Sequence, residues 1–298
     1  MKLTILGNGS ALPAYGRHPS AQVLEHNGKY YLIDCGEGTQ MRMQEAGISL
    51  FKIDHIFISH LHGDHYFGLV ALVSSLSLLA RTRPLCIYGP PEMESILKIQ
   101  LPWELGFPIH FHALNTTQPE DILQTKSLLV RSFPVVHSVP TCGFRFQEIK
   151  RKRILDPEKA REYDIPAYFF SRLTDGENYT RKDGTVIGNE LVTQPGLPEK
   201  IYVYSADTAY AEHLHPEMAG ADLLYHEATY LNEDIQKAES RLHSTTYQAA
   251  QAASSAKVKV LLIGHFSSKY KDLDPFLNEC RELFPATELS REGETYAI

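Results

Sequence analysis

Apolar and polar positions along this chain divide into short strand-like runs separated by longer stretches with helical spacing. The strand-like runs hold four to seven residues and span residues 2–6, 21–25, 30–34, 53–59, 85–88, 128–133, 143–148, 200–206, 222–226, 258–264 and 294–298. Helical stretches are expected near residues 37–46, 64–80, 92–101, 246–256 and 274–283. Short strands mixed with helices along the whole chain predict an α/β sandwich with two sheets inside and helices outside.

Residues 150–197 interrupt this pattern. They begin with four consecutive basic side chains and contain three prolines among scattered glycines. Over residues 150–184, nine Lys and Arg oppose seven Asp and Glu, a local charge of +2, so the rest of the chain carries −9 within the total of −7. A protein with a net negative charge binds nucleic acid poorly unless its basic residues are clustered. In this chain the basic residues are clustered within residues 150–184. We expect one domain over residues 1–298 with an inserted, projecting arm at 150–197.

Composition places the chain among ordinary globular proteins, with 298 residues, 43% hydrophobic and 22% charged. The longest apolar run, residues 69–80, contains three serines and is too short to span a bilayer. Residues 1–6 are too brief for the apolar part of a signal peptide. The four cysteines lie far apart without a C-x-x-C pair, which favours reduced thiols. These features predict a soluble, cytoplasmic protein with no membrane partner.

The densest chemical signal is an H-x-H-x-D-H segment directly after the strand-like run at 53–59. It places His60, His62, Asp64 and His65 in one short loop. Neutral imidazoles and a carboxylate suit a cation such as Zn²⁺, and ligands close in sequence need little chain entropy to be gathered. A solvated loop that is merely rich in histidine is the alternative. The apolar run on each side favours a metal site at the end of a strand.

Three further candidates each follow an apolar strand-like run: His137, Asp207 and His265. Taken singly, each could be a surface histidine or a polar residue that ends a strand. Strand ends that meet at one edge can converge even when they are distant in sequence. Together with the H-x-H-x-D-H segment, they supply enough ligands for two metals.

The same residues, in the same order, resemble the ribonuclease Z family of metallo-β-lactamase-fold nucleases, the tRNA 3′-processing endonucleases. The resemblance covers essentially the whole chain. The H-x-H-x-D-H segment is shared across the superfamily. The His226-Glu227-Ala228-Thr229 and His243-Ser244-Thr245 segments are more specific to the family.

The resemblance implies a four-layer αββα sandwich with two zinc ions between the sheets. One zinc would be held by His60, His62 and His137. The other would be held by Asp64, His65 and His265, with Asp207 bridging the two. Asp34 would orient a ligand histidine, although an aspartate that ends a strand before Cys35-Gly36 is an equally good interpretation.

The implied reaction is removal of the 3′ trailer from precursor tRNA, leaving a 3′-hydroxyl on the tRNA and a 5′-phosphate on the trailer. Two zincs would lower the pKa of a bound water to about 7 and hold the phosphoryl oxygens. Asp64 is the candidate proton acceptor, and His243, oriented by Glu227, is the candidate acid. The alternative roles for Glu227 and His243 are a carboxylate at a strand end and a neighbour of the helix cap at Thr245.

The basic cluster Lys150, Arg151, Lys152 and Arg153 resembles in position the arm with which the family grips the tRNA body. The usual Gly-Pro element is replaced by the stretch at residues 165–170. Lys269 stands where an arginine is common, which exchanges a bidentate phosphate contact for a point charge. The family also suggests a homodimer.

Two other functions are alternatives to tRNA processing. A phosphodiesterase or esterase for small cyclic nucleotides or aryl esters could use the same metals, but it would not need a basic arm. A structural zinc protein is disfavoured because closed structural sites prefer thiolate ligands.

Overall fold

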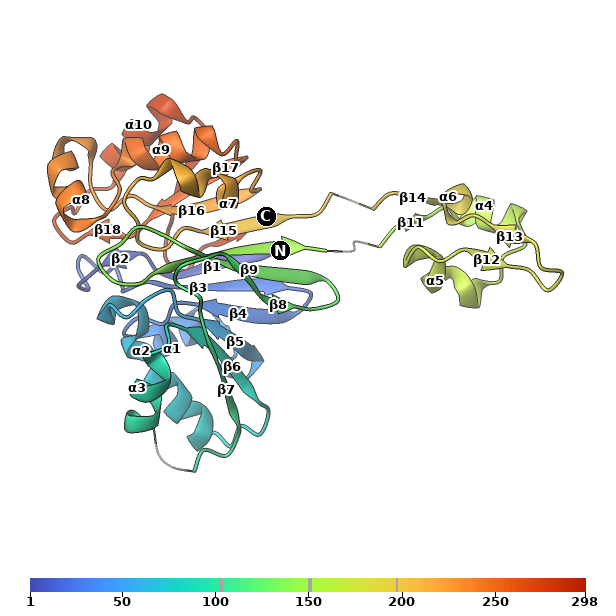
Figure 1. The fold of residues 1–298 in the computed structure, drawn as a ribbon, viewed down its shortest axis with the longest axis horizontal. Helices are drawn as coiled ribbons and strands as arrows, with labels where there is room; N and C mark the ends of the chain where they lie inside the picture. Colours follow the sequence, from blue (N-terminus) through green and yellow to red (C-terminus); the bar gives the residue numbers. More distant parts are fainter. Residues whose placement is uncertain (102–103, 150–151, 197) are drawn as a thin grey trace. The chain divides into compact units, whose positions relative to one another are not determined.

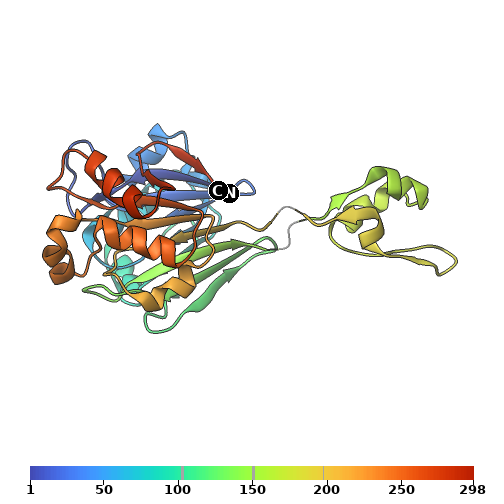
Figure 2. The ribbon, with the colours of Figure 1, turned by 90° about the horizontal axis from the view of Figure 1, so that it is seen from above.

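Two large sheets carry most of the strands expected from the sequence. In the computed structural model, which describes residues 1–101, 104–149, 152–196 and 198–298, each of these two sheets has seven strands. The sheets lie against each other, and helices cover their outer faces (Figures 1 and 2). This arrangement confirms the predicted αββα sandwich. Within the described residues, no helix is long and apolar enough to cross a membrane.

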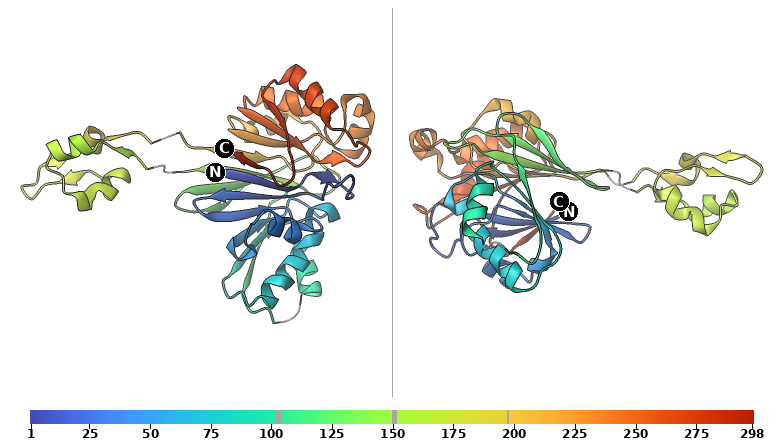
Figure 3. Two further views of the ribbon diagram at one scale, coloured as in Figure 1. Left: turned by 180° about the vertical axis from the view of Figure 1, so that it is seen from behind. Right: turned by 60° about the horizontal axis from the view of Figure 1, so that its bottom comes forward.

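The first sheet has the strand order β20-β1-β3-β4-β5-β6-β7. Its strands are β1 (Lys2–Gly7), β3 (Ala21–His26), β4 (Lys29–Ile33), β5 (Ile53–Phe57), β6 (Leu85–Gly89), β7 (Ile109–Ala113) and β20 (Thr295–Ala297). β4 to β7 run parallel, so helical crossovers connect them. These helices are α1 (Thr39–Glu45), α2 (Gly63–Leu78) and α3 (Met93–Gln100). They pack on the outer face of this sheet (Figure 3).

The second sheet has the order β19-β17-β16-β15-β10-β9-β8. Its strands are β8 (Glu120–Gln124), β9 (Leu128–Pro134), β10 (Cys142–Glu148), β15 (Ile201–Tyr204), β16 (Leu223–Glu227), β17 (Val260–Gly264) and β19 (Thr287–Leu289). The last four are parallel neighbours. The helices that follow them are α7 (His215–Met218), α8 (Ile235–Arg241), α9 (Thr246–Ser255) and α10 (Asp274–Leu283). Alanines of α9 form much of the core beneath this layer.

Several short elements were not predicted from the sequence. β7 is an edge strand in which His110 and His112 are exposed, so its sequence lacks the apolar run of a buried strand. The segment Gly9–Ser10 forms the short strand β2, which pairs with β18 (Phe266–Ser267). This pairing is tertiary, because its partner lies at the other end of the chain.

The chain divides into two compact units. The catalytic unit comprises Met1–Ile122, Val130–Phe146 and Ile201–Ile298. The inserted unit comprises Leu123–Leu129 and Gln147–Lys200, and therefore contains the arm expected at 150–197.

The inserted unit has a small core of its own, built from Ile165, Phe169, Leu173, Ile187 and Val192. Its first helix, α4 (Pro157–Glu162), begins with proline at the first position. The side chain of Asp156 caps this helix by accepting from the backbone amides of Glu158 and Lys159. The strands β11 (Ile154–Leu155) and β14 (Thr193–Gln194) pair at its base.

Candidate metal centre and active site

Each predicted metal ligand lies shortly after the end of a strand. The loop after β5 carries the H-x-H-x-D-H segment into α2, so that Asp64 and His65 lie in the first turn of that helix. His137 follows β9, Asp207 follows β15 and His265 follows β17 directly. The two sheets thereby bring ligands from distant parts of the sequence to one place.

One cluster consists of His60, His62, His137 and Asp207, whose ligand atoms all lie within 4.8 Å of one another. His62 Nδ1 lies 3.1 Å from His60 Nε2 and 3.1 Å from His137 Nε2. The Oδ2 atom of Asp207 lies 3.7 Å from His60 Nε2 and 3.9 Å from His137 Nε2. Three imidazoles and one carboxylate oxygen thus surround a single point.

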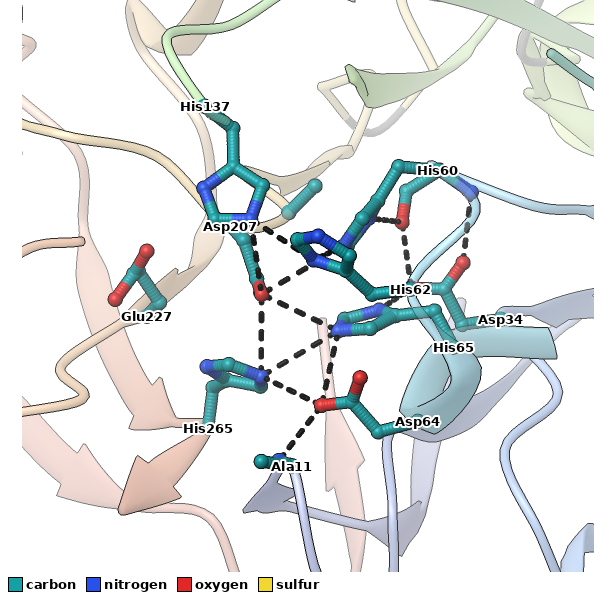
Figure 4. A network of polar contacts seen from close by, with 12 residues as sticks. Ala11, Asp34, His60, His62, Asp64, His65, His137, Asp207, Glu227 and His265 are labelled. Carbon is teal, nitrogen blue, oxygen red and sulfur yellow. Dashed lines mark hydrogen bonds and ion pairs between the residues drawn. The ribbon is translucent and has the colours of Figure 1, made fainter. Parts of the chain in front are cut away.

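A second cluster consists of Asp64, His65 and His265. Asp64 Oδ2 lies 3.6 Å from His65 Nε2 and 3.4 Å from His265 Nε2. The same Asp207 Oδ2 atom lies 3.3 Å from His65 Nε2 and 3.2 Å from His265 Nε2. Asp207 therefore stands between the two clusters (Figure 4).

The imidazoles are oriented by contacts at their other ring nitrogen. In four of them Nε2 faces the cluster while Nδ1 is held by a neighbouring oxygen at 2.7–2.9 Å. The pairs are His60 with Ser59 Oγ, His65 with Asp34 Oδ2, His137 with Leu242 O and His265 with Thr229 Oγ1. Such contacts fix the ring direction and the tautomer of a metal ligand. Thr229 belongs to one of the sequence motifs, and Ser59 and Leu242 each directly precede another. The Leu242 contact uses a backbone carbonyl, which no residue type signals in the sequence.

Asp34 is fully buried and accepts several hydrogen bonds besides its contact with His65. Its carboxylate accepts from Ser59 N at 2.7 Å, from Ser59 Oγ at 2.9 Å and from the Tyr204 hydroxyl at 2.6 Å. The contact with Tyr204 links the two sheets behind the clustered His and Asp side chains. They place Asp34 in the position from which it can orient His65.

Three residues at this edge adopt the left-handed backbone conformation, namely Asp34, Ala206 and His265, with φ of 55°, 57° and 58°. Each follows the end of a strand that leads into the site. For a residue with a Cβ this conformation costs roughly 1–2 kcal/mol. Such strain is typical of functional sites, where surrounding contacts hold the backbone in place.

The donor set of imidazoles and carboxylates suits a borderline divalent cation. Apart from Asp207, each cluster offers three side chains, and Asp207 Oδ2 lies 3.2–3.9 Å from histidine nitrogens of both clusters. Burial raises the pKa of Asp207, but His265 and His65 outweigh this effect and hold the pKa well below its usual range. Asp207 is therefore an anion, the charge state that a carboxylate needs to bind a metal.

Glu227 and His243 form a hydrogen-bonded pair beside the clusters. Glu227, at the end of β16, lies 2.9 Å from His243 Nδ1 through Oε1. The carboxylate also accepts from the backbone amides of Thr208 at 2.6 Å and Ser244 at 3.0 Å. Burial lowers the pKa of His243, but the charge and hydrogen bond of Glu227 outweigh it and raise this pKa to about 9.

A cavity of about 480 Å³ opens onto both clusters and onto His243. Asp64, Asp207, His243 and His265 line it. Its outer wall contains Leu12 and Phe67, which the sequence did not single out. Leu12 belongs to the loop after β2, whose Ala11 amide donates to Asp64 Oδ2 at 2.7 Å.

The basic residues expected to contact tRNA have varied surroundings. Lys150 and Arg151 lie outside the described residues. Lys152 is exposed and lies 3.3 Å from Asp175. Arg153 donates through Nε to Thr193 Oγ1 at 2.6 Å, a contact that ties β11 to β14 within the inserted unit. Lys269 contacts Asp234 on the surface of the catalytic unit.

Curated relatives match this chain along its full length. The ribonuclease Z of Bacteroides thetaiotaomicron is 39% identical over 300 residues, which cover 100% of this chain and 95% of that relative. The ribonuclease Z of Parabacteroides distasonis is 40% identical over 299 residues, covering 99% of this chain and 98% of the relative. This chain belongs to the ribonuclease Z family. The resemblance inferred from the sequence motifs is thereby confirmed.

Solved structures agree on the fold. Human tRNase Z, short form, has a TM-score of 0.71 at 24% identity and covers 100% of this chain and 99% of its own. The metallo-β-lactamase-fold protein YhfI of Bacillus subtilis has a TM-score of 0.69 at 20% identity, covering 99% of each chain. A protein-family model described as anti-Pycsar protein Apyc1 matches residues 1–102. That segment contains the H-x-H-x-D-H motif, which the superfamily shares, so this match does not separate the ribonuclease Z family from its neighbours.

Proposed function

We propose that this member of the ribonuclease Z family removes the 3′ trailer of precursor tRNA with two zinc ions held between its sheets. Family membership over the whole chain makes it an endoribonuclease that processes tRNA 3′ ends. The observation that carries the mechanism is the position of His243, which is hydrogen-bonded to Glu227 and lines the same cavity as members of both clusters.

The metals would be held by the two clusters described above, with His60, His62 and His137 on one side and Asp64, His65 and His265 on the other. Asp207 would bridge them. Zinc suits this set of imidazoles and carboxylates, and two ions would supply positive charge for the phosphoryl oxygens and acidify water.

The side chains divide the proton transfers between them. Asp64 accepts the proton of the water that attacks phosphorus. The bond from phosphorus to the 3′ oxygen breaks, and His243 donates a proton to that oxygen. The tRNA keeps a 3′-hydroxyl and the trailer a 5′-phosphate. Glu227 acts through His243, because it holds Nδ1 and leaves the other ring nitrogen for the substrate.

The direct test is incubation of the purified protein with a precursor tRNA that carries a 3′ trailer, followed by mapping of both new ends. We expect a single cut that leaves the stated termini. Hydrolysis of bis-p-nitrophenyl phosphate without any cut in the precursor would contradict the proposed function and favour a small-substrate phosphodiesterase.

Changing His243 to alanine should slow cleavage of precursor tRNA by roughly 10²- to 10⁴-fold, because the alkoxide leaving group needs a proton. The loss on bis-p-nitrophenyl phosphate should be much smaller, since p-nitrophenolate leaves without protonation. Parallel kcat measurements on both substrates check this expectation. Glu227→Gln should add little to the His243→Ala loss, and equal losses on the two substrates would contradict the role of His243 as an acid.

We also propose that the insert at residues 150–197 is the tRNA-binding arm, with Lys150, Arg151 and Lys152 as phosphate contacts. The separate core of the inserted unit supports this role, because a small folded module can present charge without support from the catalytic unit. Arg153 fits this role less well, since its guanidinium is engaged by Thr193. Lys269 is a further candidate contact near the site, paired at present with Asp234.

Replacing Lys150, Arg151 and Lys152 by alanine should flatten the slope of log affinity against log salt for tRNA by up to about three units. Hydrolysis of bis-p-nitrophenyl phosphate should barely change, because the metal ligands are untouched. A matched control replaces Lys2, Lys257 and Lys271, three exposed lysines of the catalytic unit. An unchanged slope in the arm variant, or an equal change in the control, would remove the arm from tRNA binding.

The family further suggests a homodimer, and its substrate implies a cytoplasmic enzyme, because precursor tRNA is processed where it is made. Light scattering of the purified protein across a concentration series tests the first proposal. A mass of one chain at all concentrations would contradict it.

A further inference from the structure

Two large apolar side chains are exposed at the active-site cavity. Leu12 is 65% exposed and Phe67 is 64% exposed, and both line the cavity that contains Asp64 and His243. A single exposed apolar residue is common on protein surfaces. Two that face the same catalytic cavity form a local apolar wall beside the reacting groups, which points to an apolar part of the substrate.

The ring of Phe67 is held at the start of α2. A Cβ built on Gly63 would come within 2.2–2.7 Å of three ring carbons, so the ring lies across the position where Gly63 has no side chain. Tyr66 contacts it edge-on, with ring centroids 5.0 Å apart at 71°. Phe67 therefore keeps an exposed ring about one helical turn after Gly63 and Asp64, at the edge of the two ligand clusters.

The residues around Leu12 and Phe67 indicate which part of a substrate could bind there. The described residues that line the cavity include Pro13, Pro19 and the carboxylate of Glu37, and none of them is lysine or arginine. A phosphate would find no countercharge on this wall. A nucleobase, in contrast, has an apolar face that stacks on an aromatic ring.

We infer that Phe67 is a stacking platform for the base of a nucleotide that adjoins the scissile phosphate, with Leu12 packing beside that base. The inference rests on the proposed function, since the phosphate must lie at the metal clusters next to Asp64. Stacking tolerates any base, which suits an enzyme whose precursors differ in sequence around the cut. Phe67 thus positions the substrate and takes no part in bond breaking.

The test combines variants of Phe67 with modified precursors. Phe67→Leu removes the aromatic face, and Phe67→Trp retains one. The matched control is Phe51→Leu, at a phenylalanine that is 41% exposed in the short helix η1 (Leu50–Lys52) and does not line the cavity. The precursors carry an abasic nucleotide either at the last retained position or at the first trailer position, next to an unmodified precursor.

We expect Phe67→Leu to lower kcat/KM on the unmodified precursor by roughly 5- to 100-fold, the range of one base stack. Phe67→Trp should retain most of the activity, and Phe51→Leu should match the wild type. On the abasic precursor that lacks the stacked base, Phe67→Leu and wild type should become equal. That precursor identifies which of the two nucleotides stacks.

The inference is overturned if Phe67→Leu loses the same factor on all three precursors, or if Phe67→Trp falls as far as Phe67→Leu. Failure of the proposed function would look different, because the wild type itself would then leave the unmodified precursor uncut. Because Phe67 is exposed, its replacement removes little core packing, and thermal unfolding of each variant checks that the fold is retained.

Discussion

Replacing Asp207 by alanine is expected to abolish cleavage, by at least about 10³-fold, and to strip both metals from the protein. Its Oδ2 atom lies 3.2–3.9 Å from the Nε2 atoms of four histidines, so its loss removes the one ligand that both clusters share. Elemental analysis after dialysis, together with precursor cleavage, measures both effects.

Asp207→Asn is the informative companion, because it keeps the shape and one oxygen but loses the negative charge. We expect it to fail almost as completely, since a neutral amide bridges two cations poorly. The control Asp272→Ala removes an exposed carboxylate elsewhere on the surface and should retain both metals. A fully active Asp207→Ala protein with two tightly bound metals would disprove the bridging role.

Replacing Asp64 by alanine should lower cleavage by about 10³-fold or more while tRNA affinity stays close to that of the wild type. The proposed base would be missing, whereas the phosphate contacts expected on the arm would remain. Cleavage at saturating substrate and binding measured without turnover separate the two quantities.

Asp64→Asn distinguishes the two functions of this carboxylate. The amide oxygen can still accept from Ala11 N, the contact that holds the loop carrying Leu12, but it cannot take a proton as the carboxylate does. Both variants should therefore lose cleavage. If Asp64→Ala binds the precursor far more weakly yet turns over normally at saturation, then Asp64 serves binding and another group is the base.

The strands and the main helices were predictable because their signals are local. The runs at 53–59, 85–88 and 258–264 predicted β5, β6 and β17, in each of which most residues are buried. β7 was not predicted because it is an edge strand with exposed polar side chains such as His110 and His112, and so it has no apolar run. β2 was not predicted because its pairing partner, β18, lies more than 250 residues away in the sequence.

The kind of chemistry at the site could also be predicted from residues that are close together in the sequence. The H-x-H-x-D-H loop, with four ligands in six residues, needs no tertiary information to be recognised as a metal site. The two segments around Glu227 and His243 narrowed the family, although nothing in their spacing required the 2.9 Å contact between them.

Only the tertiary structure decided which side chains meet and which face solvent. It brought His137, Asp207 and His265 to the H-x-H-x-D-H loop, because sheet packing, and not sequence distance, determines where strand ends converge. It engaged Arg153 with Thr193, and it left the ring of Phe67 exposed beside Asp64. The sequence by itself determined the types of ligand and the order of strands and helices, since those depend on near neighbours. The contacts that orient each ligand, and the apolar wall of the cavity, depend on residues far along the chain and so required the fold.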